Sequence, residues 1–402
     1  METKRYSSLT DMQEAAALLA GGELVAVPTE TVYGLCANGL DGAAVEKIYT
    51  VKGRPENKPL SLMISGKEAV ETLCHDVPAG ACALMAAFWP GPLTIILPAR
   101  EHIPSVVLSG GSTVGLRCPD HPLTLELLRQ CGLPLAGPSA NPSGAPAPTD
   151  ASGVLAYFDG RIAAVIDGGA CQEGEPSTIL DISSRPYRIL RQGALCSDKL
   201  AEVLRRGLKV IGFTGGTGGG KTTALNVLRE KGALVLDCDE VYHELTLSSA
   251  PLREALEGRF GAVYEDGVLI RKRLGAVVFK DPQALQDLNA ITHHMVVEEC
   301  ERRLCDFALQ GGELAAIDAI GLFESGLDTH CMTTVAITAP EEQRMARIMK
   351  RDGISEEYAR SRIAAQHEEQ WFTDRCAHVL RNDGTLEEYE NRARSLFGQI
   401  LQ

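Results

Sequence analysis

Residues 210–223 read VIGFTGGTGGGKTT, an apolar run followed by a glycine-rich loop and a Lys-Thr pair. From Gly215 to Thr222 the segment matches the phosphate-binding pattern GxxxxGK(S/T) at each fixed position. Glycine lets the backbone turn tightly and aim its N–H groups at phosphate oxygens, and a helix that begins near Lys221 adds the positive end of its dipole. The stretch therefore predicts a strand, a phosphate-binding loop and a helix. A glycine-rich loop that binds nothing is the alternative.

The rest of the second half alternates apolar runs with helical stretches. Residues 233–236, 314–317 and 334–337 read as buried strands, and the first two run into Asp237 and Asp318. Strand, helix and strand at these spacings predict βαβ units with a parallel sheet, whose ligands bind at the carboxyl ends of the strands. We therefore expect an α/β fold of the P-loop, nucleotide-kinase-like type in this half.

Further residues of this half favour phosphoryl transfer. Lys221 would bridge the terminal phosphates of a nucleotide, and the Thr222 hydroxyl would hold Mg²⁺. Asp239 follows the second strand, where a carboxylate can orient an acceptor hydroxyl and take its proton. Its alternative role is to cap the helix that follows it. A GTPase would usually show an NKxD motif, and the sequence has none.

A row of arginines and a hinge follow the fourth strand. Arg344, Arg347 and Arg351 recur at three- and four-residue spacing, so they occupy adjacent positions of one helix face and can clamp phosphates. A solvated charged surface is the alternative. Gly353 and the run Ser355-Glu356-Glu357 read as a hinge and the start of a new helix. The pattern predicts a helical lid, which a kinase needs to keep water away from ATP.

These motifs, taken in order, resemble dephospho-CoA kinases over nearly the whole second half. The matching segments are GFTGGTGGGKTT, LVLDCDEVYHEL, DGVLIRKRLGAVVF, LNAITHH, IGLFES, RIMKRDGISEEYARSRIAAQ and VLRNDG. The resemblance implies transfer of phosphate from ATP to the ribose 3′-hydroxyl of dephospho-CoA, with Mg²⁺. It implies the catalytic residues Asp239, Lys221, Arg271 and Arg351. It also implies ATP contacts from Gly216, Gly218, Gly219, Gly220, Lys221, Thr222, Thr223 and Asn382, the last near the adenine.

Two departures from that family fall near the expected acceptor site. The family's His-Pro is His293-His294 here, and its Pro-Leu-Leu-x-Glu begins with Ile320-Gly321. They affect the expected shape of the acceptor site more than the phosphoryl chemistry. A different small-molecule P-loop kinase is the alternative for this half.

The first half carries no short pattern that names a reaction. Strand-like runs at 24–27, 60–64, 93–97 and 113–116 alternate with helical stretches at 11–19, 43–51 and 123–130, which predicts an open twisted α/β sheet. Four polar clusters stand out: PTETVYGL from residue 28, KGRPENK from residue 52, GPSANPSG from residue 137, and the single arginines Arg117 and Arg191. Separate basic groups and hydroxyl-rich loops suit an anionic ligand, whereas solvated loops and plain turns are the alternatives.

Together these clusters resemble the YrdC-type L-threonylcarbamoyladenylate synthases across about residues 10–195. The motifs PTETVYGL, KGRPENKPL, FWPGPLT, VGLRCPDHP, LPLAGPSANPSG, PSTILD and ILRQG fall in that family's order. The resemblance implies synthesis of threonylcarbamoyl-AMP and pyrophosphate from ATP, L-threonine and bicarbonate, for the t6A modification of transfer RNA. It implies ATP contacts from Lys52, Arg54, Lys58, Thr113, Asn141, Thr149 and Arg191, and threonine contacts from Thr31, Arg117, Ser139 and Ser177. Met63 stands where many members carry a polar residue, so we expect a difference in threonine affinity or selectivity.

Length and charge set the domain expectations. The 402 residues carry a net charge of −14 and neither half is net basic, which argues against a nucleic-acid module, although an RNA-binding first half is the alternative. A short amphipathic helix at 197–206, with Ser197 as its N-cap, reads as the junction. We therefore expect a synthase domain over 1–196, a linker helix over 197–207 and a kinase domain over 208–402.

The remaining features concern location and partners. The 12 cysteines form no CxxC pair, which predicts reduced, mostly buried thiols and no zinc site. The first residues lack the apolar core of a signal peptide, and no run of about 18 apolar residues occurs, so we expect a cytoplasmic protein without a membrane span. The expected partners are ATP, L-threonine, bicarbonate and dephospho-CoA, together with tRNA-modifying proteins.

Overall fold

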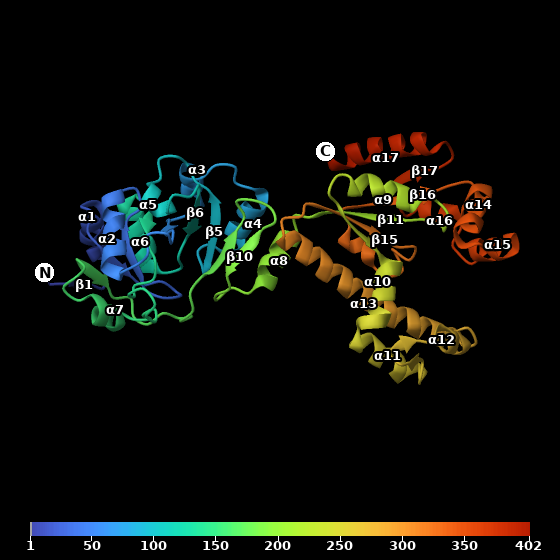
Figure 1. Ribbon diagram of the computed structural model, residues 1–402, viewed down its shortest axis with the longest axis horizontal. Coiled ribbons are helices and arrows are strands. Elements are labelled where there is room, and N and C mark those ends of the chain that lie inside the picture. The colour runs from blue at the N-terminus through green and yellow to red at the C-terminus, as the bar shows by residue number, and fades with distance from the viewer. Residues whose placement is uncertain (1) are drawn as a thin grey trace. The chain divides into compact units, whose positions relative to one another are not determined.

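The structure of the protein, a computed structural model, describes residues 2–402 and divides into two compact units (Figure 1). The first unit runs to Gly207 and includes Leu309–Gly311, and the second consists of Leu208–Ala308 and Gly312–Gln402. Both units are α/β, as the sequence predicts. None of the helices in the described residues combines the length and apolar content that crossing a bilayer requires.

The first unit is built on a mixed, ten-stranded sheet. Its spatial order is β1 (Lys4–Tyr6), β8 (Ala164–Ile166), β2 (Val25–Val27), β3 (Gly34–Asn38), β7 (Leu135–Ala136), β4 (Ser61–Met63), β6 (Thr113–Arg117), β5 (Leu93–Pro98), β9 (Thr178–Asp181) and β10 (Arg188–Arg191). The four predicted strands are confirmed as β2, β4, β5 and β6. The other six were not predicted, because most of them are too short to show a period of their own.

Helices of the first unit pack against this sheet through apolar side chains. They are α1 (Met12–Ala20), α2 (Gly42–Lys52), α3 (Val70–Leu73), α4 (Ala79–Phe88), α5 (Ser105–Leu108), α6 (Pro122–Cys131), α7 (Ala151–Phe158) and α8 (Ser197–Arg205). Leu19 of α1 and Leu127 of α6 share one core with Val25 and Val27 of β2. The three predicted helices of this half are confirmed as α1, α2 and α6.

Two helix ends need comment. Asp41 caps α2 by accepting from Ala43 N and Ala44 N, and Gly53 ends it in the left-handed conformation at φ 59°, which sends the chain directly into Arg54. The predicted N-cap of α8 is wrong by one residue. Cys196 holds that position without a side-chain bond and Ser197 is the first helical residue.

The second unit is built on a parallel, five-stranded sheet. Its order is β12 (Leu234–Asp237), β15 (Leu314–Asp318), β11 (Lys209–Thr214), β16 (Thr333–Thr338) and β17 (His378–Arg381). All four predicted strands are confirmed, and β17 is the one that was missed. Because the chain leaves the central strand β11 toward β12 and later returns on the other side as β16, the loop after β11 lies at a topological switch point.

Both faces of this sheet are covered. Val210 and Ile317 lie in one apolar core, whereas Ile211, Phe213 and Val335 lie in the other, where Phe213 meets Phe397 edge-to-face. The helices are α9 (Lys221–Arg229), α10 (Cys238–Ser248), α11 (Ala250–Phe260), α12 (Arg271–Val278), α13 (Pro282–Leu309), α14 (Glu341–Asp352), α15 (Glu356–Ala364), α16 (Glu369–Thr373) and α17 (Leu386–Leu401).

A small hairpin between α11 and α12 was not predicted. It joins β13 (Tyr264–Glu265) to β14 (Val268–Leu269) through Asp266 and Gly267, both at positive φ. Asp-Gly between two short strands is a short-range signal for such a turn. All twelve cysteines are free thiols, as expected, but the expectation that most are buried is wrong: five are buried, five are partly buried, and Cys82 and Cys196 are exposed.

Candidate active sites

The glycine-rich loop of the second unit has the conformation that its sequence predicts. The strand β11 ends at Thr214, the helix α9 begins at Lys221, and Gly215 and Gly220 have φ of 133° and 105°. A Cβ on Gly215 would lie 2.2 Å from the Ile337 carbonyl oxygen, and one on Gly220 would lie 2.1 Å from Asn382 Nδ2. Only glycine fits these two positions, so the close approach that shapes the loop depends on them.

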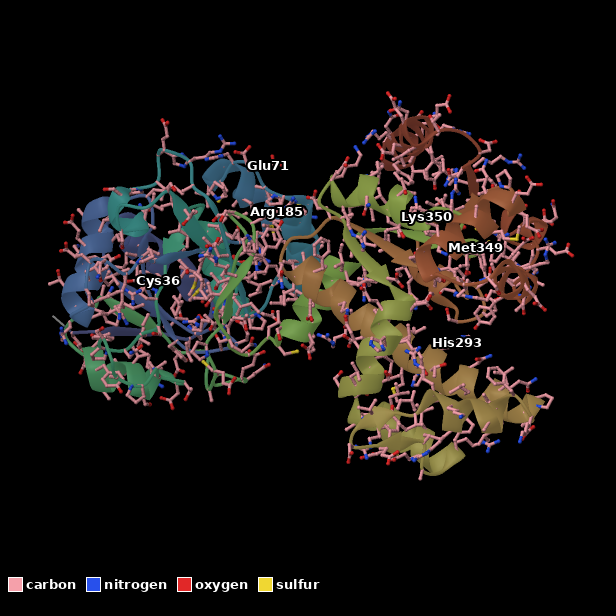
Figure 2. All side chains as sticks on the ribbon, turned by 45° about the vertical axis from the view of Figure 1, so that its right-hand side comes forward. Cys36, Glu71, Arg185, His293, Met349 and Lys350 are labelled. Carbon is pink, nitrogen blue, oxygen red and sulfur yellow. The ribbon has the colours of Figure 1, made fainter. Side chains whose placement is uncertain are left out.

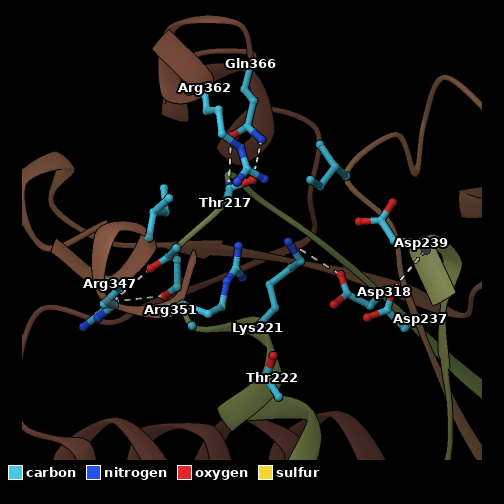
Figure 3. A pocket seen from close by; sticks show the side chains of 15 residues that line it. Thr217, Lys221, Thr222, Asp237, Asp239, Asp318, Arg347, Arg351, Arg362 and Gln366 are labelled. Carbon is cyan, nitrogen blue, oxygen red and sulfur yellow. Dashed lines mark hydrogen bonds and ion pairs between the residues drawn. The ribbon is translucent and has the colours of Figure 1, made fainter. Parts of the chain in front are cut away.

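A cavity of about 360 Å³ opens in front of this loop (Figure 3). It is lined by the loop from Thr217 to Thr222, by carboxylates from the strand ends and by basic groups from α14 and α15: Asp237, Asp239, Asp318, Arg347, Arg351 and Arg362. Acidic side chains lie on one side of Lys221 and arginines on the other (Figure 3). Cations aimed into a polar hollow beside backbone N–H groups form a site for a polyanion.

Lys221 and Asp318 form the centre of this cavity. Lys221 Nζ lies 3.7 Å from Asp318 Oδ1 and donates to the Gly215 carbonyl at 3.1 Å. The longer distance is an ion pair without a hydrogen bond, and Asp318 Oδ1 is buried with no hydrogen-bond partner among the described residues. Burial raises the pKa of Asp318 to about 6, against the opposing attraction of Lys221.

This shift predicts a pH-dependent effect of Asp318→Asn on stability. The ordinary pKa of the group is 3.8, so the folded unit holds a proton that the unfolded chain releases between pH 3.8 and 6. The charge on Asp318 therefore costs no stability below pH 3.8, and above pH 6 it lowers the free energy of unfolding of the second unit by about 3 kcal/mol. We expect Asp318→Asn to stabilise the second unit at pH 8 and to change little at pH 4. Urea unfolding without nucleotide or Mg²⁺ measures this, and equal stabilisation at both pH values would contradict it.

Asp239 does not cap the helix α10, which corrects the alternative role considered for it. Asp237 is the N-cap and accepts from Asp239 N and Glu240 N, while Asp239 lies in the first turn. The Asp239 carboxylate is exposed and lines the cavity without a structural bond among residues 2–402. It is therefore free to meet a ligand.

The three arginines of α14 lie in different surroundings. Arg347 and Arg351 line the cavity, as predicted for a clamp. Arg344 is buried behind the loop, where Nε donates to the Thr217 carbonyl at 3.0 Å. Gly353 at φ 66° ends α14 and Ser355 caps α15, so the predicted new helix is confirmed, and the role of Gly353 as a hinge stays a prediction.

Four other predicted residues lie outside the lining of this cavity. Asn382 is buried, where Nδ2 donates to the Gly219 carbonyl at 2.9 Å and Oδ1 accepts from Arg347. Gly216 lies within the loop and Thr223 in the first turn of α9, and neither lines the cavity. Arg271 is exposed, and its Nη2 lies 3.4 Å from His243 Nδ1 on α10.

A second cavity of about 190 Å³ shares Asp239 and Ile320 with the first. Its lining includes Gly321 and, on the long helix α13, His293 (Figure 2). Of the two departures noted in the sequence, Ile320-Gly321 lines this hollow, whereas His294, which replaces the family's proline, does not line it and lies 3.4 Å from Glu298. Because Asp239 lines both cavities, its side chain would lie between a group bound in one cavity and a group bound in the other.

The first unit has a cavity of about 170 Å³ where β3, β4, β6 and β9 meet the loop of Ser139. The predicted residues that line it are Arg54, Arg117, Ser139, Ser177 and Arg191, together with Met63. Arg191 Nε donates to the Ser177 carbonyl at 2.9 Å and Nη2 to Ser177 Oγ at 3.0 Å. Burial lowers the pKa of Arg54 and Arg191, and neither has a carboxylate partner among residues 2–402. Two uncompensated guanidinium groups make this an anion site.

Unlike Arg54 and Arg191, Arg117 has a carboxylate partner that balances its charge. Its Nη2 donates to Glu30 Oε1 at 2.7 Å and to Thr31 Oγ1 at 2.8 Å, and all three residues are buried. Glu30 Oε2 also accepts from Asp120 N at 3.0 Å. Glu30 was not singled out in the sequence, since only the fold brings it to Arg117.

Two other predicted residues of this unit, Lys52 and Asn141, form hydrogen bonds to the backbone of a loop beside the cavity. Lys52 is buried and donates to the carbonyls of Ser139 and Asn141, and burial lowers its pKa to about 8. Asn141 accepts from the Ser139 hydroxyl at 2.5 Å and donates to the Ala145 carbonyl at 2.7 Å. The residues that do not line the cavity are Lys52, Asn141, Thr31, Lys58, Thr113 and Thr149.

Comparison with known proteins gives a match for each unit. The Sua5/YciO/YrdC family model, described as "Telomere recombination", matches residues 17–193, and the dephospho-CoA kinase model matches residues 209–388. A threonylcarbamoyl-AMP synthase of Pyrococcus abyssi (strain GE5 / Orsay) is 44% identical over 190 residues, 47% of this chain and 56% of that protein. A Mycobacterium tuberculosis (strain CDC 1551 / Oshkosh) protein, provisionally named as the same synthase, is 36% identical over 190 residues, 47% of this chain and 87% of that protein.

The second unit has its own relatives. A dephospho-CoA kinase of Syntrophotalea carbinolica (strain DSM 2380 / NBRC 103641 / GraBd1) is 34% identical over 194 residues, 48% of this chain and 92% of that protein. This chain spans little more than half the length of the Pyrococcus abyssi synthase.

Fold and sites thus define an α/β chain that joins a P-loop kinase unit to a unit with a separate anion cavity. The chain belongs to the threonylcarbamoyl-AMP synthase family through its first unit and to the dephospho-CoA kinase family through its second.

Proposed function

We propose that the chain is a bifunctional enzyme. Its second unit phosphorylates the ribose 3′-hydroxyl of dephospho-CoA with ATP, and its first unit forms L-threonylcarbamoyl-AMP and pyrophosphate from ATP, L-threonine and bicarbonate. The observation that carries the proposal is the cavity of the second unit where the glycine-rich loop, Lys221, Arg351 and Asp239 meet, together with a separate cavity of the first unit with Arg54 and Arg191. Synthase over 1–196, connecting helix over 197–207 and kinase over 208–402 is our assignment of the chain, and the cytoplasm, which holds these substrates, is its proposed location.

In this proposal each group of the kinase cavity has its own task. Asp239, exposed between the two cavities, accepts the proton of the acceptor hydroxyl while the hydroxyl oxygen attacks the γ-phosphorus. Lys221, Arg347 and Arg351 offset the charge on the phosphates, and the loop amides hold them in place. The acceptor lies in the cavity with His293 and Gly321.

Mg²⁺ fits the donor groups of this cavity. Asp318 Oδ1 is buried without a hydrogen-bond partner among the described residues, and the Thr222 hydroxyl lines the same hollow. Oxygen donors of this kind suit Mg²⁺, which usually keeps several waters and takes few protein ligands. Thr222 would hold the ion with the phosphates, and the ion would neutralise charge that develops on them.

The synthase geometry suits a small amino acid and an anionic tail. We place the threonine carboxylate at Arg117, near Thr31, Ser139 and Ser177, and the triphosphate at Arg54 and Arg191. The threonine amine attacks the bicarbonate carbon and a water molecule leaves, which gives a carbamate; a carbamate oxygen then attacks the α-phosphorus of ATP and pyrophosphate leaves. No protein nucleophile is needed, and the walls of the cavity would shield the unstable carbamate from water.

The ion pair of Arg117 gives a prediction for this site. We expect Arg117→Met to lower the free energy of unfolding of the first unit by about 3–5 kcal/mol, because Glu30 stays buried with an unpaired charge. Adding Glu30→Gln restores most of that stability without restoring threonine-dependent pyrophosphate release. Thermal unfolding and a threonine titration separate the two effects. A double variant that regains both stability and activity would show that Arg117 has only a structural role.

Two assays test the proposal against its alternatives. A panel of hydroxyl acceptors with ATP decides the second unit, and absence of transfer to dephospho-CoA would favour another small-molecule kinase. For the first unit, RNA binding with a steep salt dependence and no threonine-dependent pyrophosphate release would favour an RNA-binding module. Contact with tRNA-modifying proteins belongs to the same proposal, because threonylcarbamoyl-AMP must reach a tRNA.

A further inference from the structure

Gln366 makes a two-point contact with the phosphate-binding loop. Its Oε1 accepts from Thr217 N at 2.9 Å, and its Nε2 donates to Thr217 Oγ1 at 2.6 Å. Figure 3 shows this side chain reaching from above the loop, on the segment that also carries Arg362. A neutral amide provides one acceptor and one donor side by side, which matches the N–H and hydroxyl of Thr217.

Arg344 completes this contact. Its Nε donates to the Thr217 carbonyl at 3.0 Å and its Nη2 to Gln366 Oε1 at 3.2 Å. The N–H, carbonyl and hydroxyl of Thr217 are thus all bonded to Gln366 or Arg344, and both Thr217 and Arg344 are buried. The loop is therefore held at Thr217 by α14 and by the segment after α15.

That segment ends the helix pair α14 and α15, which the sequence predicts to be a lid. α14 and α15 pack through Ile348, Ala359 and Ile363, with Gly353 between them, and Gln366 follows two residues after α15 ends. Asp352, the last residue of α14, accepts from Arg351 Nε and from Arg362 Nη1, both at 2.6 Å. Both arginines line the cavity, so the lid carries two cations over the site and returns to the loop at Gln366.

We propose that Gln366 is a positioning residue that couples the lid to the phosphate-binding loop. Its amide bonds to Thr217 fix the far end of the lid, so that Arg351 and Arg362 lie over the phosphates only when the loop has its binding conformation. This inference rests on the proposed kinase function, since it concerns ATP held by that loop. A lid released at this point would leave the phosphates open to water.

The first test compares Gln366→Met with Gln370→Met. Gln370 is exposed on α16 and its side chain bonds to Asp374, so the control removes an equal amide from a neighbouring position away from the cavity. We expect Gln366→Met to lower kcat for transfer by about tenfold, since two hydrogen bonds are lost. We also expect it to raise the ratio of ATP hydrolysis to transfer by a similar factor, with thermal unfolding unchanged. Equal ratios in the two variants would overturn the proposal.

The second test uses Thr217 and needs no acceptor. Thr217→Ser keeps the hydroxyl that receives the Gln366 amide, whereas Thr217→Val removes it at nearly constant shape. Hydrogen exchange over residues 353–366 is measured with and without a non-hydrolysable ATP analogue. We expect the analogue to slow exchange at least about tenfold in the wild-type and Thr217→Ser chains and about twofold or less in Thr217→Val and Gln366→Met.

The two tests separate failure of this inference from failure of the proposed function. If dephospho-CoA is not the acceptor, transfer is absent but the lid is still protected by the analogue in the wild type and not in Gln366→Met. Equal protection in Thr217→Ser and Thr217→Val would overturn the role of Gln366 whatever the acceptor is. If Gln366→Met does not fold, the Thr217 pair decides the matter alone.

Discussion

Lys221→Ala is expected to reduce dephospho-CoA phosphorylation by at least about a hundredfold while threonylcarbamoyl-AMP formation stays within about twofold of the wild type. Lys221 is the cation at the centre of the loop cavity, 3.7 Å from Asp318 Oδ1, and it is absent from the lining of the first unit's cavity. Its loss removes charge stabilisation from the transferring phosphate and leaves Asp318 without its ion-pair partner. Parallel assays of both reactions on one purified preparation measure the effect.

A matched control is available on the same unit. Lys231 is exposed just beyond α9, so Lys231→Ala removes an equal side chain away from the cavity and should leave both activities unchanged. If Lys221→Ala lowers the two activities by the same factor, the division of labour between the units is wrong. If it lowers neither, the glycine-rich loop is not the site of ATP in the second unit.

Asp239→Asn is expected to lower kcat for phosphoryl transfer by about 10²- to 10⁴-fold with the KM for ATP nearly unchanged. An amide keeps the shape of the side chain but cannot take the proton of the acceptor hydroxyl. Because Asp237, not Asp239, caps α10, and the Asp239 carboxylate is exposed in the cavity, the fold should be unaffected. Steady-state kinetics with varied ATP and dephospho-CoA separate kcat from KM.

Glu240→Gln is the control for this change. Glu240 is the next residue of α10 and is exposed, and it does not line either cavity of the second unit. We expect it to retain the wild-type kcat. A retained kcat in Asp239→Asn would assign the proton to another group or to water, and a rise in the KM for ATP alone would place Asp239 in nucleotide binding.

The features that the sequence predicted correctly are mainly those that depend on residues close together in the chain. The glycine-rich loop, the strand before it and the helix break at Gly353 follow from residues whose conformations are restricted within a few positions, and the structure confirms all three. The parallel sheet of the second unit follows likewise from apolar runs separated by helices. The six missed strands of the first unit are held mainly by pairing with distant neighbours, which a single stretch cannot show.

The residue roles that the sequence did not predict depend on contacts between segments far apart in the chain. Spacing placed Arg344 on the same helix face as Arg347, but only the fold shows that it turns to the buried Thr217 carbonyl. Glu30 and Gln366 gained roles through partners 87 and 149 residues away, Arg117 and Thr217. The individual roles of the predicted site residues stay predictions that the variants above test.

The central claim is that one chain carries two separate triphosphate-binding sites. Equilibrium dialysis with a non-hydrolysable ATP analogue, in the presence of Mg²⁺ and L-threonine, counts them directly. Two molecules of analogue bound per wild-type chain, falling to one in Lys221→Ala, is the expected result. One molecule per wild-type chain, or none left in Lys221→Ala, would contradict the account.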